Sequence, residues 1–521
     1  MTAALPLSAC SIGDEQFVLR VASWEEYIDL GGWDKEELID IDNPYGEEGV
    51  IGVNSMVDDF TKWFNEGDFG FTIRVEYSTF GTNEDLYNRL NLGDKYDLVC
   101  PSDYLIMKLL AEDKLQPYSD DFKNTDKEEN YYSQFVSPYI DEVFKLNGWS
   151  NYAACYMWGT TGIVYNPDIV DVEDVSSWTV LQNEKYNRRV TIKDNVRDSY
   201  FPALGILNRD ELLSGEITDE RRSKLLNATD RETIDEAEQI LKRIKENVYS
   251  FETDSGKADM ITGKVAANYQ WSGDAVYIMD EAEGDEKHPT QLWYSVPEEC
   301  TNLWFDGWVM LKDGIDGSEK KQIAAEAFVN FLSRPDNAIR NMYYIGYTSS
   351  IAGDMIYDYL DFNYGAVFDT EDEYYDEEIT EICEYDLSYF FGEETYLYID
   401  ASQLDFDTDS ADYAELTLGE EYGNDTVYTV YSDPGNISHG RQAFAQYPPQ
   451  SVIDRSVIME DFGDKLSDIN QMWINVRCLD LKDFNPVVVW TTAAIIVVIA
   501  TAIVLYRCRY LIFFRKSKDE E

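Results

Sequence analysis

The first third of the chain alternates short apolar runs with amphipathic segments. The runs FVLRVASW (17–24), FTIRVEYST (71–79) and YDLVCPS have the apolar spacing of strands, and the third ends at a proline turn. Between them, 56–65 has apolar residues at helical spacing, and NEDLYNRLNL predicts a helix that begins at Thr82 or Asn83 with an acidic first turn. This order of strands and helices predicts an α/β lobe with a largely parallel sheet.

The same style continues over 165–306. The charged segment 230–247 predicts a helix, and KVAANYQWSGDA (264–275) predicts a strand, a turn and a helix. Further on, 324–332 predicts an amphipathic helix that Arg334-Pro335 stops. Ligands of open α/β sheets bind beyond the carboxyl ends of strands. We therefore expect a site at the strand ends SWEEY, YSTFGTN and CPSDY.

A long apolar segment lies near the C-terminus. Residues 486–506 contain no charged side chain and, as a helix, would cover about 30 Å, the hydrocarbon thickness of a bilayer. Basic residues dominate 507–521, whereas acidic residues dominate before the segment. The positive-inside tendency predicts a transmembrane helix with a short cytoplasmic tail and everything before about residue 485 outside the cell.

The N-terminal region and the cysteines give weaker signals. Leu7-Ser8-Ala9-Cys10 resembles a bacterial lipobox, so we interpret 1–15 as a lipoprotein signal remnant and linker in which Cys10 carries lipid. The seven cysteines contain no CxxC spacing, which argues against a zinc or thioredoxin-like motif. The five between Cys100 and Cys478 could include a disulfide, but the sequence does not give its pairing.

Charge restricts the classes of partner. The 521 residues include 101 acids and 42 bases, a formal charge of −59 and a pI near 4.1. This argues against a nucleic-acid partner, and it suits cationic ligands or solubility in a demanding medium. The two histidines argue against a His-rich metal site and a Ser-His-Asp enzyme. No cofactor is predicted.

An acidic region interrupts the later part of the chain. Residues 341–440 contain 25 acids and no lysine or arginine, together with many tyrosines. This composition predicts a partly folded insertion with a solvated surface, which we place at 351–440. A calcium site is disfavoured because Asp405, Asp407 and Asp409 lack the glycine and distal glutamate of an EF-hand.

Ten motifs in order resemble the spermidine/putrescine-binding proteins of bacterial ABC importers. They are SWEEYID, VEYSTFGTNEDLY, YDLVCPSDY, YMWGTTGIVYN, VSSWTVL, KDNVRDSY, YQWSGDA, LWFDGWVM, FVNFLSRPDNA and IGYTSS, with a weaker tail at YPPQSVIDR and DFGDKL. The resemblance implies a two-lobe, type II periplasmic-binding-protein-like α/β fold with hinge strands, an ABC permease and ATPase as partners, and no enzyme activity. It places the two-lobe solute-binding domain at 16–350, with the C-terminal part of that domain at 441–482.

The chemistry of a polyamine agrees with this resemblance. Buried ammonium groups need carboxylates, and methylene segments need apolar walls, which aromatic rings also provide for cations. Matching positions imply ring or hydroxyl contacts from Trp24, Tyr27, Ser78, Phe80, Thr253, Trp271, Trp304 and Tyr347, and ammonium contacts from Asp198 and Asp306. Asn195, where some members have an acid, and Phe80, which replaces a tyrosine, leave the choice of polyamine open.

Two other classes of function are kept as alternatives. A membrane-anchored amine sensor, or a surface adhesin that uses the acidic insertion, would have the same fold. An extracellular acid-pair glycosidase is the least supported, because nothing in the sequence marks two carboxylates as a catalytic pair.

Overall fold

The structure is a computed structural model of the 521-residue chain. It describes residues 17–46, 49–285, 288–366, 381–409, 411–417, 427–432, 437–478, 498–504 and 506. Statements below about what is absent refer to these residues.

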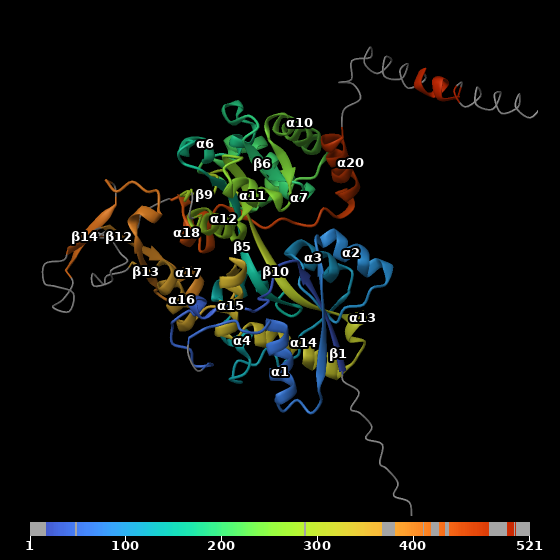
Figure 1. Ribbon diagram of the computed structural model, residues 1–521, viewed down its shortest axis with the longest axis vertical. Coiled ribbons are helices and arrows are strands. Elements are labelled where there is room, and N and C mark those ends of the chain that lie inside the picture. The colour runs from blue at the N-terminus through green and yellow to red at the C-terminus, as the bar shows by residue number, and fades with distance from the viewer. Residues whose placement is uncertain are drawn as a thin grey trace, which may run out of the picture.

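Two long strands connect two lobes. β5 (Ala153–Tyr165) and β10 (Thr301–Leu311) are antiparallel, and every residue of both strands is buried. The hydrogen-bonded order is β2-β1-β3-β10-β5-β8-β6-β7, so lobe 1 lies on the β10 side and lobe 2 on the β5 side (Figure 1). The two-lobe α/β architecture with hinge strands is thus present.

Lobe 1 is built around parallel strands β1 and β2, which pair along their whole length. Its core contains Phe60, Phe64, Trp308 and Phe328. The helices and strands of lobe 1 are β1 (Phe17–Trp24), α1 (Met56–Glu66), β2 (Ile73–Phe80), α2 (Asn83–Leu92), β3 (Leu98–Val99), α3 (Asp103–Ala111), β4 (Leu115–Gln116), α4 (Tyr131–Phe135), α5 (Pro138–Leu146), α13 (Lys312–Ile315), α14 (Glu319–Leu332), α15 (Pro335–Ile345), β11 (Thr348–Ser349) and α16 (Asp354–Tyr364).

Lobe 2 has a separate core that contains Trp178, Tyr200, Phe201 and Tyr269. Strand β6 pairs in parallel with both β7 and β8. The helices and strands of lobe 2 are α6 (Val172–Val175), β6 (Val190–Lys193), α7 (Val196–Leu207), α8 (Arg209–Leu212), α9 (Asp219–Leu226), α10 (Arg231–Asn247), β7 (Ser250–Glu252), α11 (Ser255–Ile261), β8 (Ala267–Trp271), α12 (Ser272–Glu283), β9 (Trp293–Ser295), β16 (His439–Gly440), α18 (Gln442–Gln446), α19 (Gln450–Ile453), β17 (Ser456–Val457) and α20 (Leu466–Arg477).

Local sequence signals explain several boundaries. Thr82 accepts the backbone N–H of Asp85 and begins α2, and Asp230 does the same for Thr233 in α10, as the acidic first turns indicate. The predicted turn between β8 and α12 is absent, because Trp271 ends the strand and is itself the cap of the helix. Pro335 is the first residue of α15, a position where the missing N–H costs nothing.

The acidic region contains folded structure. Its sheet has the order β13-β12-β15-β14, from strands β12 (Glu381–Asp386), β13 (Tyr396–Asp400), β14 (Asp412–Thr417) and β15 (Val427–Ser432), with a short helix α17 (Ser388–Phe391). It lies at the side of the two lobes in Figure 1. The hydroxyls of Tyr385 and Tyr389 donate to the backbone carbonyls of Tyr447 and Pro448 at 2.7 and 2.9 Å. These contacts dock the sheet on the body of the protein.

The predictions for the two ends of the chain fall mostly outside the described residues. Cys10, 479–497 and 507–521 are not described, and 498–504 is helical with Val498, Ile499 and Ile503 exposed. No helix within the described ranges is long and apolar enough to cross a membrane. Among these residues the cysteines are free thiols, so no disulfide joins any two of them, and no group of three or more metal-binding side chains occurs.

Candidate functional site

The carboxyl ends of β1 and β2 form an aromatic edge on lobe 1. The parallel register places Trp24 opposite Phe80, and their ring centroids are 4.9 Å apart. Phe80 is fully buried, whereas Trp24 is half-buried. The indole N–H of Trp24 is buried and has no hydrogen-bond partner in the part of the chain that the structure describes. An unpartnered buried donor is uncommon and is consistent with a missing ligand or water.

Asp306 lies on the hinge strand β10, where the register with β5 shifts by one residue. Its side chain is 6% exposed, and Oδ2 accepts the hydroxyl of Tyr27 at 2.8 Å. Within the described ranges, Oδ1 is buried and accepts no hydrogen bond of normal geometry. Burial raises the pKa of the Asp306 carboxyl to about 6, although the nearby hydroxyls of Ser102 and Tyr27 lower it. Asp306 is therefore a buried acid with one free acceptor.

Aromatic rings surround this acid. Tyr347 lies 5.2 Å from Tyr27 and 5.6 Å from Trp304 between ring centroids, and the Trp304 indole donates to the carbonyl of Thr160 at 3.0 Å. Tyr27 and Trp304 belong to one apolar cluster, against which Tyr347, Trp24 and Trp271 pack.

A glycine makes room for this arrangement. A Cβ atom at Gly273 would lie 2.1 Å from the ring of Tyr347, so only glycine fits there. The Tyr347 hydroxyl donates to Oδ1 of Asp274 at 3.1 Å. Burial raises the pKa of the Tyr347 hydroxyl, so it remains a neutral donor. Tyr347 thus joins the rings around Asp306 to lobe 2.

The carboxyl ends of β6, β7 and β8 form a charged edge on lobe 2. These parallel strands end at Lys193, Glu252 and Trp271. Lys193 Nζ lies 3.9 Å from the Trp271 ring centroid and 3.8 Å from a carboxylate oxygen of each of Glu252 and Asp274. It donates to the carbonyl of Thr253 at 3.0 Å.

Asp198 lies beside this edge in the first turn of α7. Burial raises the pKa of its carboxyl to about 6, and the cations of Lys193 and Arg197 partly offset that effect. Asn195, where some members of the family have an acid, caps α7, and its side-chain oxygen accepts the backbone N–H of Arg197 at 2.8 Å. Asp198 is therefore the acid that this segment offers.

The two lobes touch across the site. The Arg197 guanidinium of lobe 2 lies 3.9 Å from the ring of Tyr104 in α3 of lobe 1 and 4.1 Å from that of Phe462. Together with the contact from Tyr347 to Asp274, this places the strand ends of the two lobes in a closed arrangement. We call the set Trp24, Tyr27, Asp198, Trp271, Trp304, Asp306 and Tyr347 the inter-lobe site.

Three of the ten predicted residues, Ser78, Phe80 and Thr253, are not part of the set that we call the inter-lobe site. Ser78 donates its hydroxyl to the carbonyl of Val21 at 3.3 Å, Phe80 lies buried behind Trp24, and the side chain of Thr253 is exposed while its carbonyl binds Lys193. Their proposed ligand contacts stay predictions.

Sequence reasoning missed four charged residues at or near the inter-lobe site. They are Glu26, Lys193, Glu252 and Asp274. All except Glu252 lie within motifs that carried the resemblance. Glu26 has a φ of 52°. Burial lowers the pKa of Lys257, but Asp274, Asp254 and, more weakly, Glu26 across the lobes raise it above the ordinary value. The position of Glu26 within the strand-end motif SWEEYID was the signal that could have identified it as a residue near the site.

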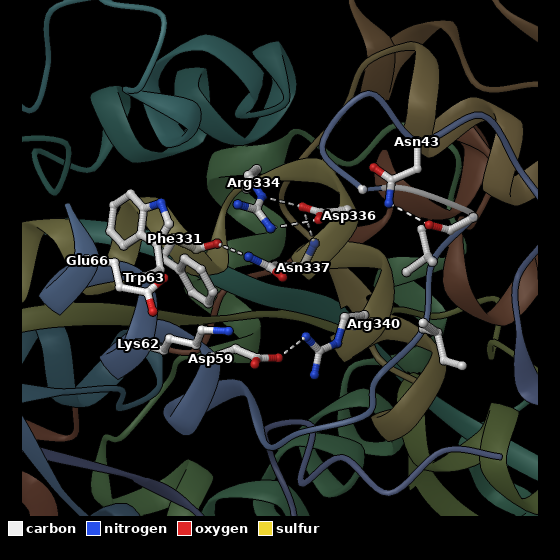
Figure 2. A pocket seen from close by; sticks show the side chains of 14 residues that line it. Asn43, Asp59, Lys62, Trp63, Glu66, Phe331, Arg334, Asp336, Asn337 and Arg340 are labelled. Atoms are coloured by element: carbon white, nitrogen blue, oxygen red, sulfur yellow. Dashed lines mark hydrogen bonds and ion pairs between the residues drawn. The ribbon is translucent and has the colours of Figure 1, made fainter. Parts of the chain in front are cut away.

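A separate cavity of about 600 Å³ lies in lobe 1, near α1, α15 and Val50 (Figure 2). It contains none of the ten predicted residues. Figure 2 shows Arg334 bound to both carboxylate oxygens of Asp336, and Arg340 bound to Asp59. The Arg340 guanidinium donates to Oδ2 of Asp59 at 2.9 Å. Because these wall charges are already paired, the inter-lobe site is the stronger candidate.

The fold and the site define an extracellular solute-binding protein. Residues 55–353 match the family described as bacterial extracellular solute-binding protein, which is more than half of the chain. The chain belongs to this family.

The particular relatives are polyamine-binding proteins. The chain is 30% identical over 277 residues to the spermidine/putrescine-binding periplasmic protein of Escherichia coli K12, and 29% identical over 281 residues to that of Salmonella typhimurium; each alignment covers 53% of this chain and 70% of the relative. The spermidine/putrescine ABC transporter substrate-binding protein PotD of Streptococcus pneumoniae has the same fold, with a TM-score of 0.52, 21% identity, and coverage of 89% of this chain and 99% of that one.

These findings confirm the resemblance and the two-lobe fold. They also confirm that the chain is a binding protein and not an enzyme, since its relatives are substrate-binding proteins of transporters. The glycosidase alternative is therefore rejected.

Proposed function

We propose that this protein captures a polyamine such as putrescine or spermidine between its lobes. The observation that carries the proposal is Asp306, a buried acid with a free oxygen beside the rings of Tyr27, Trp304 and Tyr347. An ammonium group fits such a site, because it can donate a hydrogen bond to the free carboxylate oxygen and is attracted by the faces of the rings. The names of the relatives from Escherichia coli and Salmonella typhimurium point to the same ligands.

Each residue of the inter-lobe site has a role in this proposal. Asp306 holds one ammonium, with its other oxygen fixed by Tyr27, and Asp198 attracts the second. The rings of Trp24, Trp271, Trp304 and Tyr347 form walls for the methylene chain, since all of them belong to or pack on one apolar cluster. Excluding water from these groups strengthens their attraction for the ligand.

Delivery to a membrane permease completes the proposal. Hinge closure on the ligand would produce the form that an ABC permease and its ATPase accept, with the binding domain outside the cytoplasm. The apolar run 486–506 supports attachment to the membrane, and Val498, Ile499 and Ile503 are exposed as a lipid-facing helix requires. Lipidation of Cys10 stays a prediction from the sequence.

Calorimetry on the full-length chain in a mild detergent tests the binding function. Putrescine and spermidine are titrated in turn, with a neutral diol of matched length as the control ligand. We expect saturable binding of at least one polyamine and none of the diol. If neither polyamine gives heat or raises the melting temperature, the proposed function is wrong.

A further inference from the structure

Lys193 places a cation of the chain itself beside the ligand site. Its side chain is 1% exposed, and its ammonium lies over the face of Trp271, near Glu252 and Asp274, and bonded to the carbonyl of Thr253. Lys193 is the last residue of β6, and its side chain reaches across the ends of the neighbouring strands β7 and β8.

The surroundings of Lys193 have the chemistry that a polyamine ammonium requires. Two carboxylates, one carbonyl acceptor and one indole face meet at Nζ, and a ligand ammonium would need the same groups to leave water. Because the subsite is already occupied by a buried lysine, a ligand cannot place an ammonium there without displacing Lys193.

The charges of the region limit the ligand further. Glu252 and Asp274 face the two cations Lys193 and Lys257, the latter 3.4 Å from Asp274. Arg197 is directed to the carbonyl of Glu460 and to Asp461. Asp306 and Asp198 are the two buried acids of the inter-lobe site that remain for ligand ammoniums. Two carboxylates match two positive charges.

We infer that Lys193 is a tethered ammonium that occupies an amine subsite of lobe 2 and makes the protein selective for a diamine over a triamine. This inference rests on the proposed function, since it names the ligand class of the same site. A lysine that only ties the ends of β6, β7 and β8 together would affect stability and leave the order of ligand preference unchanged.

The first test compares ligands of increasing charge on full-length variants. n-Butylamine, putrescine and spermidine carry one, two and three ammoniums, and their dissociation constants are measured by calorimetry. We expect the unmodified protein to bind putrescine at least as tightly as spermidine. Lys193→Ala opens the subsite, so the affinity ratio of spermidine to putrescine should rise tenfold or more.

Two further variants control for loss of charge and loss of stability. Lys193→Met keeps most of the side-chain volume, so it should not raise the ratio. Lys321→Ala removes a lysine that pairs with buried Asp97 at 2.8 Å in lobe 1, and it should change the melting temperature but not the ratio. A ratio that stays within threefold in Lys193→Ala overturns the inference.

The second test is chemical rescue and does not depend on polyamine binding. Ethylammonium should raise the melting temperature of Lys193→Ala by several degrees, whereas neutral ethanol should not, and neither should affect the unmodified protein. Absence of rescue overturns the inference even if polyamines bind. Rescue without polyamine binding would support an amine subsite at Lys193 but would contradict the proposed function, and the selectivity would fall with it. If Lys193→Ala does not fold, the unmodified protein decides: tighter binding of spermidine than of putrescine overturns the inference, and the reverse order supports it.

Discussion

In both lobes the carboxyl ends of parallel strands face the inter-lobe site, but the side chains at these ends differ in chemistry. The lobe 1 edge at Trp24 and Phe80 is aromatic, and the buried indole N–H of Trp24 has no hydrogen-bond partner among the described residues. The lobe 2 edge at Lys193, Glu252 and Trp271 contains charges that already face one another. Equivalent positions of two α/β sheets therefore need not serve a ligand in the same way.

Because of this difference, we expect the hinge residue Asp306 to contribute most to the binding of a ligand ammonium. Asp306 belongs to β10, which passes through both lobes, and its free oxygen has no cation of the chain beside it among the described residues. Asp198, by contrast, has Lys193 and Arg197 near it. A ligand ammonium should gain most at Asp306, because that carboxylate is desolvated and not yet paired.

The largest expected effect tests this contrast directly. Asp306→Asn should weaken polyamine binding by about 2–5 kcal/mol, the range measured when one member of a buried charge pair is removed. Asp198→Asn should cost less than Asp306→Asn, because the cations of Lys193 and Arg197 already offset part of the Asp198 charge. Calorimetry on both variants gives the comparison.

Stability provides the control for Asp306→Asn. An asparagine oxygen can still accept the hydroxyl of Tyr27, and the buried charge is gone. The ligand-free variant should therefore melt no lower than the unmodified protein. Equal losses of affinity in the two variants would show that the hinge acid Asp306 and the lobe 2 acid Asp198 contribute equally to binding, which would contradict the larger role given to Asp306.

The pH dependence should be the next largest effect. With a pKa of about 6, Asp306 goes from mostly ionised at pH 7 to mostly protonated at pH 5. Alkylammonium groups, whose pKa is about 10.4 like that of lysine, stay charged throughout. Affinity should fall about tenfold between pH 7 and 5 for each acid that the ligand needs, which is about 1.4 kcal/mol.

Folding should respond to pH in the opposite sense. Burial raises the folded-state pKa of Asp306 and Asp198 above the ordinary value, so the folded empty protein binds more protons than the unfolded chain between about pH 4 and 6. Their contribution to stability is therefore present at low pH and is lost as the pH rises through about 6. Asp103, whose pKa burial raises to about 8, remains protonated from pH 5 to 7 and adds nothing to the change in binding. A dissociation constant that stays level from pH 7 to 5 would contradict the role of Asp306, and Asp306→Asn should flatten the profile.

Sequence patterns predicted local features, such as helix caps, better than sites formed by residues that are far apart in the chain. Caps such as Thr82 and Asp230 lie next to the helices they begin, so a short window contains the whole signal. The helix over 324–332 ends at Leu332, before Arg334-Pro335 as predicted, but the sequence pattern did not predict that Pro335 also begins the next helix, α15. The ring set around Asp306 came from motifs of known relatives, and periodicity alone would not have selected those rings.

The role of Lys193 could not be predicted because it depends on alignment between strands. Lys193, Glu252 and Asp274 are far apart in the chain, and they meet only because β6, β7 and β8 are parallel and end together. Nothing in the sequence distinguished this lysine at a strand end from the other lysines of the chain as a residue of the site. A role for the Lys193 ammonium can be inferred only once its distances to two carboxylates and an indole face are known.

The smallest expected effect concerns the aromatic edge of lobe 1. Trp24→Phe keeps a ring against Phe80 but removes the indole N–H and part of the ring face, so polyamine binding should weaken by about 0.5–1 kcal/mol. Trp24→Ala removes the whole face and should cost about 2 kcal/mol, still less than Asp306→Asn. Calorimetry with putrescine measures both variants, and the melting temperature without ligand shows whether the edge still folds. If Trp24→Ala weakened binding more than Asp306→Asn, the ring wall and not the hinge carboxylate would dominate, because an apolar contact would then outweigh a desolvated charge pair.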